Sequence, residues 1–118
     1  VSILQKYTEL SCEVAQNGLR IKHGHIYVAP VDHHLLVKGD KILLNRGARE
    51  NGFRPAIDTT FRSAAAHYGA RVIGVILTGL LYDGIVGMEA VKRCGGITLV
   101  QDPEEAEFAE MPRNIVQH

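Results

Sequence analysis

The sequence predicts an α/β protein with a mostly parallel sheet. Val72–Leu77 is apolar apart from one glycine and shows no period-two alternation, which is typical of a parallel strand covered on both faces. A tight turn, a helix and a second apolar strand at Ile97–Val100 follow, so this part forms a βαβ unit with an expected right-handed crossover. Catalytic groups of such sheets lie just beyond the carboxyl ends of the strands. Asp83, in that turn, is therefore the first candidate catalytic residue.

The first half of the chain is expected to contain a helix, two strands and a hairpin. In chain order these elements cover residues 2–10, 11–15, 26–29 and 34–45. In the hairpin, two β-rich runs flank Gly39-Asp40, a pair that favours a primed two-residue turn. The sheet is then mixed, or the hairpin stands apart from it. The polar segment 45–53 contains two glycines and is expected to be an exposed loop.

The second half contributes the helices. A helix is expected to begin at Arg54-Pro55, because proline suits the first helical turn, and to end at Gly69. Its apolar face is expected to comprise Ile57, Phe61, Ala64, Ala65 and Tyr68. A second helix is expected over residues 85–94, and a short last helix over 111–118 after an acidic segment.

Composition excludes several classes of protein. At 118 residues the chain is one domain at most, since domains commonly run to about 100–150 residues. Thirteen basic and thirteen acidic residues give no net charge, which argues against a sequence-independent nucleic-acid binder. No apolar run approaches the ~20 residues needed for membrane insertion. Without a signal peptide, and with two isolated cysteines that are expected to be free, the sequence predicts a cytoplasmic protein.

Asp83 has two interpretations. As a residue near the start of the helix at 85–94, it favours an N-cap, because a carboxylate there accepts a backbone N–H and suits the helix dipole. From spacing alone this interpretation is the stronger. The other is an orienting carboxylate that holds a catalytic histidine in one tautomer and stabilises the imidazolium.

Other reactive side chains form no recognisable site. The only serines are Ser2, Ser11 and Ser63, and since Ser63 is expected mid-helix and Ser11 at a turn, neither of these two resembles an activated nucleophile. No phosphate-binding glycine motif is present, and no cofactor is expected. His23 and His25 share a strand face, but the sequence offers no HExxH motif or cysteine pair to complete a metal site, so a metal-binding module ranks last.

Several ordered motifs together resemble one family. They are Gly24–Pro30, His33–Val37, Arg54–Asp58 with Phe61–Ala65, Gly74–Gly79, Asp83-Gly84 with Gly87, and Met111–Arg113. This set is similar to the catalytic domain of chemotaxis protein-glutamate methylesterases, in particular the stand-alone type without a receiver domain. The resemblance implies a doubly wound α/β fold, a Ser/His/Asp triad, and hydrolysis of glutamate methyl esters, with deamidation of glutamines, on chemoreceptors.

The resemblance assigns roles to few residues of this chain. Asp83 matches the aspartate of the triad, and Leu80 stands where the family usually has a methionine lining the site. Leu81 and Tyr82 depart from the small and acidic residues often found there. The family's serine follows its first strand and its histidine follows its second, and both positions fall upstream of Val1.

The chain is therefore expected to be the C-terminal two-thirds of a methylesterase catalytic domain, with residues 1–118 holding Asp83 alone of the triad. Alone it is expected to be inactive, because losing the nucleophile and base of such a triad costs on the order of 10⁶ in kcat. Its expected partner is the methylated cytoplasmic region of a chemoreceptor. Exposed sheet edges predict self-association of the isolated chain. A non-catalytic module that binds a receptor or another partner is the alternative.

Overall fold

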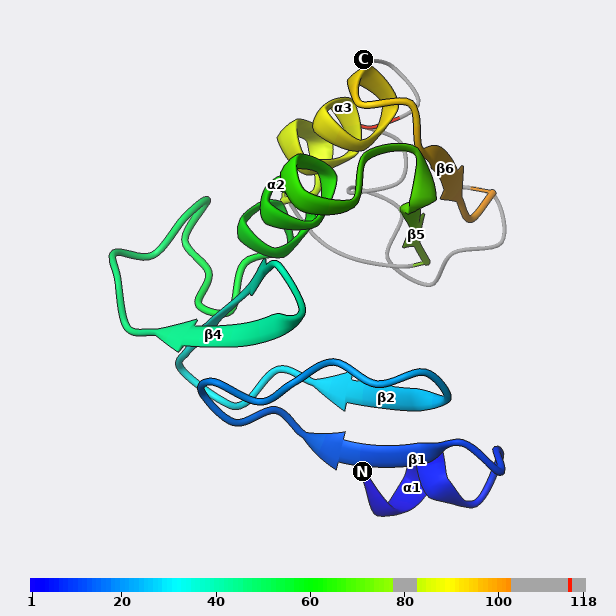
Figure 1. Cartoon of the computed structure of the whole chain (residues 1–118). Coiled ribbons are helices and arrows are strands. Elements are labelled where there is room, and N and C mark those ends of the chain that lie inside the picture. The colour runs from blue at the N-terminus through cyan, green and yellow to red at the C-terminus, as the bar shows by residue number, and fades with distance from the viewer. Residues whose placement is uncertain (78–82, 103–114, 116–118) are drawn as a thin grey trace.

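The computed structural model describes residues 1–77, 83–102 and 115 (Figure 1). The elements in chain order are α1 (Ser2–Gln5), β1 (Ser11–Val14), β2 (His25–Val28), β3 (His34–Lys38), β4 (Lys41–Asn45), α2 (Ile57–Tyr68), the 3₁₀ turn η1 (Gly69–Arg71), β5 (Ile73–Ile76), α3 (Ile85–Arg93) and β6 (Ile97–Val100). The predicted helix at 111–118 and the predicted site residue Leu80 fall outside the description, apart from Ile115.

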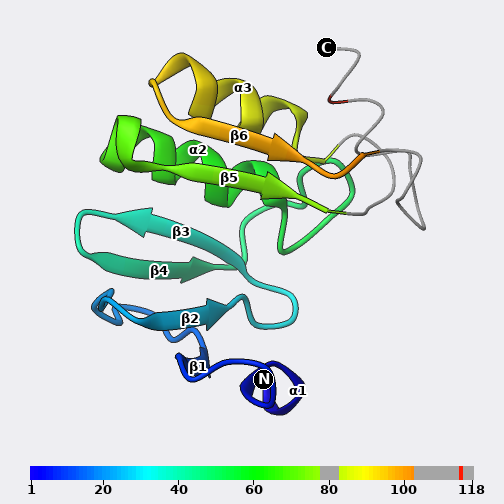
Figure 2. The same ribbon diagram turned by 90° about the vertical axis from the view of Figure 1, so that its right-hand side faces the viewer.

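Two parallel strand pairs and one antiparallel hairpin confirm the α/β fold class. Strand β1 pairs in parallel with β2, and β5 with β6, while β3 and β4 pair antiparallel. Within the described residues these are separate two-stranded sheets, not one continuous sheet. The carboxyl ends of four strands, β2, β4, β5 and β6, lie on the same side of the molecule, as their arrows show in Figure 2. The segments that follow these strands therefore begin on that side.

The predicted hairpin is confirmed, with Lys38 opposite Lys41 across the Gly39-Asp40 turn. Gly39 has φ 60 at the first turn position, the position that a type II′ turn reserves for glycine. Helix α2 is tied to this hairpin by side-chain hydrogen bonds. The Thr60 hydroxyl donates to the Leu35 carbonyl, and the Tyr68 hydroxyl donates to the Gly39 carbonyl.

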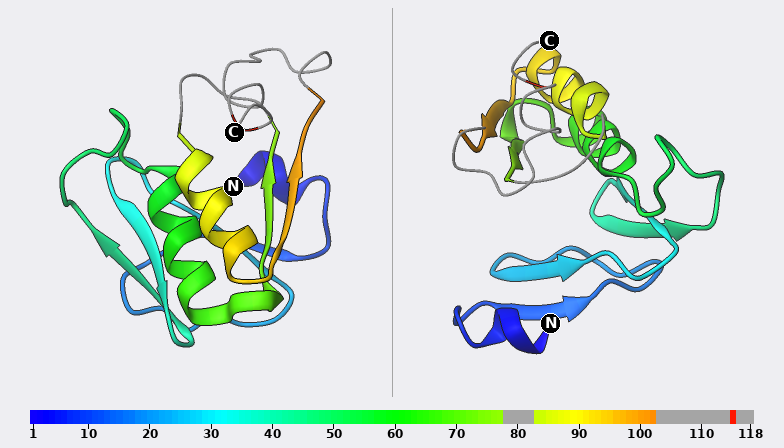
Figure 3. Two further views of the ribbon diagram at one scale, coloured as in Figure 1. Left: turned by 90° about the horizontal axis from the view of Figure 1, so that it is seen from above. Right: turned by 180° about the vertical axis from the view of Figure 1, so that it is seen from behind.

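Helices α2 and α3 lie side by side on one face of β5 and β6 (Figures 2 and 3). Val91 and Ala65 are buried between these elements, and Ile76 packs with Met88 beside them. Gly87 permits the close approach of the helices, because a Cβ there would lie 2.7 Å from Phe61 Cβ. A separate apolar cluster around Ile42 joins the hairpin to β2.

The opposite face of β5 and β6 is open, so the prediction of a strand covered on both faces is wrong for the described chain. Burial alternates along β5, and Ile73 and Leu77 keep 61% and 63% of their surface exposed. Ile97 and Leu99 of β6 are exposed as well. The physical reason is that α2 and α3 lie on the same side of the strands (Figure 2), where Phe61 of α2 and Met88 of α3 pack in one cluster with Ile76 of β5.

Two helix boundaries also differ from prediction. Helix α1 is a single turn that ends at Gln5, whose side-chain amide then donates to the carbonyls of Thr8 and Leu10 in an irregular segment. Helix α2 begins at Ile57, not at Arg54-Pro55. Ala56 is extended, with φ −107 and ψ 139, and its N–H donates to His34 Nδ1 at the hairpin, which holds this segment out of the helix. The end of α2 at Gly69 is confirmed.

Candidate functional site

Asp83 is a buried carboxylate at the edge where the parallel strands end. It lies just before α3, and 2% of its surface is exposed. Its Oδ2 accepts a hydrogen bond from the Ile57 N–H (2.7 Å), and its Oδ1 accepts one from the Asp58 N–H (3.1 Å). These are the first two amides of α2, which lack an intrahelical acceptor. Asp83 therefore caps α2, the neighbouring helix.

The prediction that Asp83 caps its own helix is wrong. Gly84 is the N-cap residue of α3, with φ 105, and Asp83 lies one residue further out. Glycine takes this left-handed conformation without the steric cost that a side chain brings. The Asp83 side chain is consequently turned across to α2, where Ala56 at the N-cap has no side-chain acceptor of its own.

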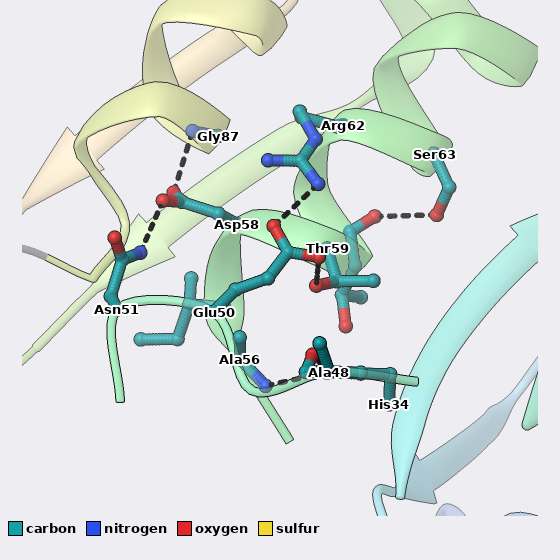
Figure 4. Close-up of polar contacts among 12 residues, drawn as sticks. His34, Ala48, Glu50, Asn51, Ala56, Asp58, Thr59, Arg62, Ser63 and Gly87 are labelled. Carbon is teal, nitrogen blue, oxygen red and sulfur yellow. Dashed lines mark hydrogen bonds and ion pairs between the residues drawn. The ribbon is translucent and has the colours of Figure 1, made fainter. Parts of the chain in front are cut away.

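Asp58 supplies the cap that α3 needs. Its Oδ1 accepts from the Gly84 N–H (3.0 Å) and the Gly87 N–H (2.7 Å), the N-cap and N3 amides of α3. A capping box satisfies the same two amides with two residues of its own chain segment. Here one carboxylate from α2 satisfies both, as Figure 4 shows for its bond to Gly87.

Asn51 joins the two carboxylates. Its side-chain Nδ2 donates to Asp58 Oδ2 at 2.7 Å and to Asp83 Oδ1 at 3.2 Å (Figure 4 shows the bond to Asp58). Asn51 and Gly52 form the turn of a small hairpin in which Glu50 and Phe53 exchange backbone hydrogen bonds. Neither Asn51 nor Asp58 was predicted from the sequence as a residue of the site. Asn-Gly is a hairpin signal in the sequence, but it does not reveal what the asparagine contacts.

Amides and helix dipoles stabilise this carboxylate pair. Asp58 and Asp83 are each 2% exposed, and no ion pair of the described residues includes either of them. The partial positive charge at the start of each helix favours the carboxylate that caps it. Among the described residues the Ile57 N–H is the donor to Asp83 Oδ2, and a carboxylate oxygen can accept a second donor such as an imidazole N–H.

A polar pocket of about 510 Å³ lies between the hairpin and α2, lined in part by His34, Glu50, Arg62 and Ser63 (Figure 4). Glu50 accepts hydrogen bonds from Arg62 and from the Thr59 hydroxyl. The hydrogen bond from Arg62 is the main cause that lowers the pKa of Glu50 below its ordinary value, against an opposing effect of burial. Ser63 donates to the Thr60 carbonyl and accepts from the Val37 N–H, so its hydroxyl ties α2 to β3.

A second charged cluster lies at the turn before β3. Asp32, which has φ 62, forms ion pairs with Arg46, Arg49 and Arg54. Hydrogen bonding from Arg54 is the largest cause of the lowered pKa of Asp32. This cluster ties the 45–56 loop, which carries Asn51, to the turn between β2 and β3.

The histidines considered as metal ligands make local contacts. His25 hydrogen-bonds through Nδ1 to the His23 carbonyl and stacks on Tyr27. Across residues 1–77 and 83–102, no group of three or more His, Cys, Asp or Glu side chains could hold a metal ion. No helix in this part of the chain is long and apolar enough to cross a bilayer.

Comparison with known proteins gives one consistent result. The family described as CheB methylesterase matches residues 1–118. A relative from Leptospira interrogans is 42% identical over 98% of this chain and 60% of its own length. The protein-glutamate methylesterase/protein-glutamine glutaminase 2 of Pseudomonas aeruginosa is 41% identical over 97% of this chain and 34% of its own length.

A solved structure agrees with these matches. The crystal structure of the Thermotoga maritima CheB methylesterase catalytic domain superposes with a TM-score of 0.91 at 34% identity. The match covers 98% of this chain and 64% of that structure. The chain thus spans about 60% of the Leptospira relative and a smaller share of the Pseudomonas one.

Proposed function

The chain belongs to the CheB methylesterase family, and on that premise we propose that it is the C-terminal two-thirds of a catalytic domain that hydrolyses glutamate methyl esters on chemoreceptors. The observation that carries the proposal is Asp83, a buried carboxylate at the strand edge whose Oδ2 accepts one hydrogen bond from the described residues, that of the Ile57 N–H. Deamidation of receptor glutamines, which the name of the Pseudomonas relative includes, belongs to the same proposal.

In the proposed mechanism Asp83 orients and does not itself react. A histidine from outside this chain donates Nδ1–H to Asp83 Oδ2, which leaves its Nε2 free to take the proton of a serine. The serine oxygen attacks the ester carbonyl, methanol leaves with that proton, and water then hydrolyses the acyl-enzyme to glutamate and free serine. For a glutamine substrate the leaving group is ammonia.

The serine and histidine of this proposal belong to a segment that packs against the open face of β5 and β6. That face presents Ile73, Leu77, Ile97 and Leu99 to solvent. Beside it, an apolar groove of about 270 Å³ runs between the end of β2 and β5, over the start of α2. Burial of exposed apolar surface stabilises by about 25 cal/mol per Å², which favours covering this face. The groove ends near Asp83, because Ile57 both lines it and donates to that carboxylate.

Methanol release from a methylated chemoreceptor tests the function. We expect the full-length protein to release methanol, and the Asp83→Asn variant to be slower by about 10⁴-fold, as when the aspartate of a serine-protease triad is changed. The chain of residues 1–118 alone is expected to release none above background. A full-length protein without esterase activity that still binds the receptor would favour the non-catalytic alternative. Substantial turnover by the chain alone would contradict the assignment of the serine and histidine to another segment.

A further inference from the structure

We propose that Asn51 is a positioning residue for Asp83, anchored by Asp58, and that this pair sets the direction in which Asp83 faces its histidine. The inference rests on the proposed function, in which Asp83 orients that histidine. Neither residue contacts substrate in the proposal. Both act through Asp83.

The backbone aims the Asn51 side chain. Asn51 has φ 55 and Gly52 has φ 83, so both turn residues adopt the left-handed conformation of a type I′ turn. Asparagine tolerates that conformation better than most residues with a side chain. The turn is closed on both sides, by the Glu50 N–H to Phe53 carbonyl bond at 3.0 Å and the Phe53 N–H to Glu50 carbonyl bond at 2.9 Å. Asn51 is consequently a fixed donor.

One amide group fits both carboxylates. A side-chain amide carries two N–H donors, and Asn51 directs them to Asp58 Oδ2 and Asp83 Oδ1. An arginine or lysine in this place would instead neutralise the pair. The neutral amide holds Asp83 Oδ1 in position and leaves the full charge of Asp83 available to the histidine.

Asp58 keeps this arrangement rigid. Through Oδ1 it holds the amides of Gly84 and Gly87, and Gly84 is the residue next to Asp83. The Asp58 backbone N–H in turn donates to Asp83 Oδ1. A shift of the Asp58 side chain therefore moves both the turn that carries Asp83 and the amide donor that holds it.

An exchange of two side chains separates positioning from stability. Asn51→Asp or Asp58→Asn alone places two acceptors or two donors against each other across the 2.7 Å contact. The double variant Asn51→Asp/Asp58→Asn restores a donor–acceptor pair there, and the new amide at position 58 keeps an oxygen for Gly84 and Gly87. Asp83 Oδ1 then faces a carboxylate at position 51 in place of an N–H. We expect the exchange to recover part of the unfolding stability that either single variant loses, because one repulsive contact remains at Asp83 Oδ1, and not to recover kcat.

The measurements are urea unfolding and steady-state methanol release with the full-length protein. For Asn51→Ala and for the double variant we expect kcat to fall by about 10²-fold, the loss that a misplaced catalytic group produces. KM is expected to stay within about twofold, because the lost interaction acts in the transition state. Asn45→Ala is the matched control, since Asn45 is the last residue of β4, just before the loop that carries Asn51, and its Oδ1 accepts only from the Gly47 N–H among the described contacts. It should retain full kcat.

The outcomes distinguish this inference from the proposed function. A wild-type protein without esterase activity contradicts the proposed function. Full activity of Asn51→Ala, or recovery of kcat together with stability in the double variant, overturns the positioning role. Amide hydrogen exchange of the full-length protein tests the positioning role of Asn51 without a measurement of catalytic activity. Asn51→Ala should speed exchange of the Ile57 and Asp58 amides that Asp83 holds, and Asn45→Ala should not, whereas equal exchange in both variants overturns the inference.

Discussion

Asp58 and Asp83 cap each other's helices. Asp83 accepts from the first amides of α2, the helix that begins with Ile57 and Asp58, while Asp58 accepts from the first-turn amides of α3, the helix that follows Asp83. The exchange satisfies the orphan donors of two helices and fixes the strand-end turn to α2. The same contacts that hold the fold at this edge therefore hold the candidate catalytic carboxylate.

Removing the Asp58 carboxylate should destabilise the protein strongly. In Asp58→Ala the buried Gly84 and Gly87 amides lose their acceptor, at a cost of roughly 1–3 kcal/mol for each buried group left unpaired, so we expect a total loss on the order of 3 kcal/mol. Urea unfolding of the full-length protein measures it. Glu89→Ala, which removes an exposed carboxylate from the same helix as those glycines, should change stability by less than about 0.5 kcal/mol. Equal effects of the two variants would contradict the capping role.

The sequence predicted those parts of the fold that depend on neighbours in the chain. The hairpin of β3 and β4 was placed correctly because Gly39-Asp40 encodes its turn locally. The edge position of Asp83 followed from the apolar strand before it. The start of α2 was not predictable, since Ala56 is held extended by His34, which is 22 residues away in the sequence.

The geometry around Asp83 was beyond sequence reasoning for the same reason. Asn51 and Asp83 are 32 residues apart, and nothing near either residue encodes their contact. Residues 45–53 were predicted to be an exposed loop, and Asn51 is exposed, yet its amide faces inward to two buried carboxylates. The open face of β5 was not predicted. An apolar run indicates that a strand can be buried on both faces, but it does not show which segment of the chain covers each face.

Gly87 should not tolerate a larger residue. In an average helix Gly→Ala stabilises by about 1 kcal/mol. At this position the new Cβ would lie 2.7 Å from Phe61 Cβ and 3.2 Å from the Asp58 backbone, so α2 and α3 must separate. We expect Gly87→Ala to lower the free energy of unfolding by about 1–3 kcal/mol, the usual cost of overpacking. Thermal unfolding of the full-length protein provides the measurement, and a raised melting temperature would show that the helices are less closely packed.

The contact between Glu50 and Arg62 should make stability depend on pH. The pKa of Glu50 is lowered in the folded protein from its ordinary value of 4.5, chiefly by the hydrogen bond from Arg62. The folded state thus binds the proton less tightly than the unfolded chain, so the contribution is complete above pH 4.5 and is lost as the pH falls through the folded-state value.

The variant Glu50→Gln removes this titration. We expect the difference in unfolding free energy between the wild type and Glu50→Gln to be largest at neutral pH and to shrink below pH 4.5. Urea unfolding between neutral and acidic pH measures the difference. Glu13→Gln, which changes a carboxylate that forms no ion pair among the described residues, should show no such trend. A difference that grows on acidification would reverse the sign of the effect and contradict the ion-pair explanation.

The open face of β5 and β6 should drive self-association of the chain of residues 1–118. Val75 and Leu99 lie opposite each other in the strand register, and both are exposed on this face at 45% and 53%. Two copies that pack these faces together remove apolar surface from water, which stabilises the pair by about 25 cal/mol per Å² buried. We expect sedimentation of the isolated chain to show dimers or larger species. The variant Val75→Lys/Leu99→Lys places charges at the centre of the face and should shift the chain to monomers, whereas Lys92→Glu/Arg93→Glu on α3 should not. A monomeric wild-type chain would mean that this face is stable in water without a partner.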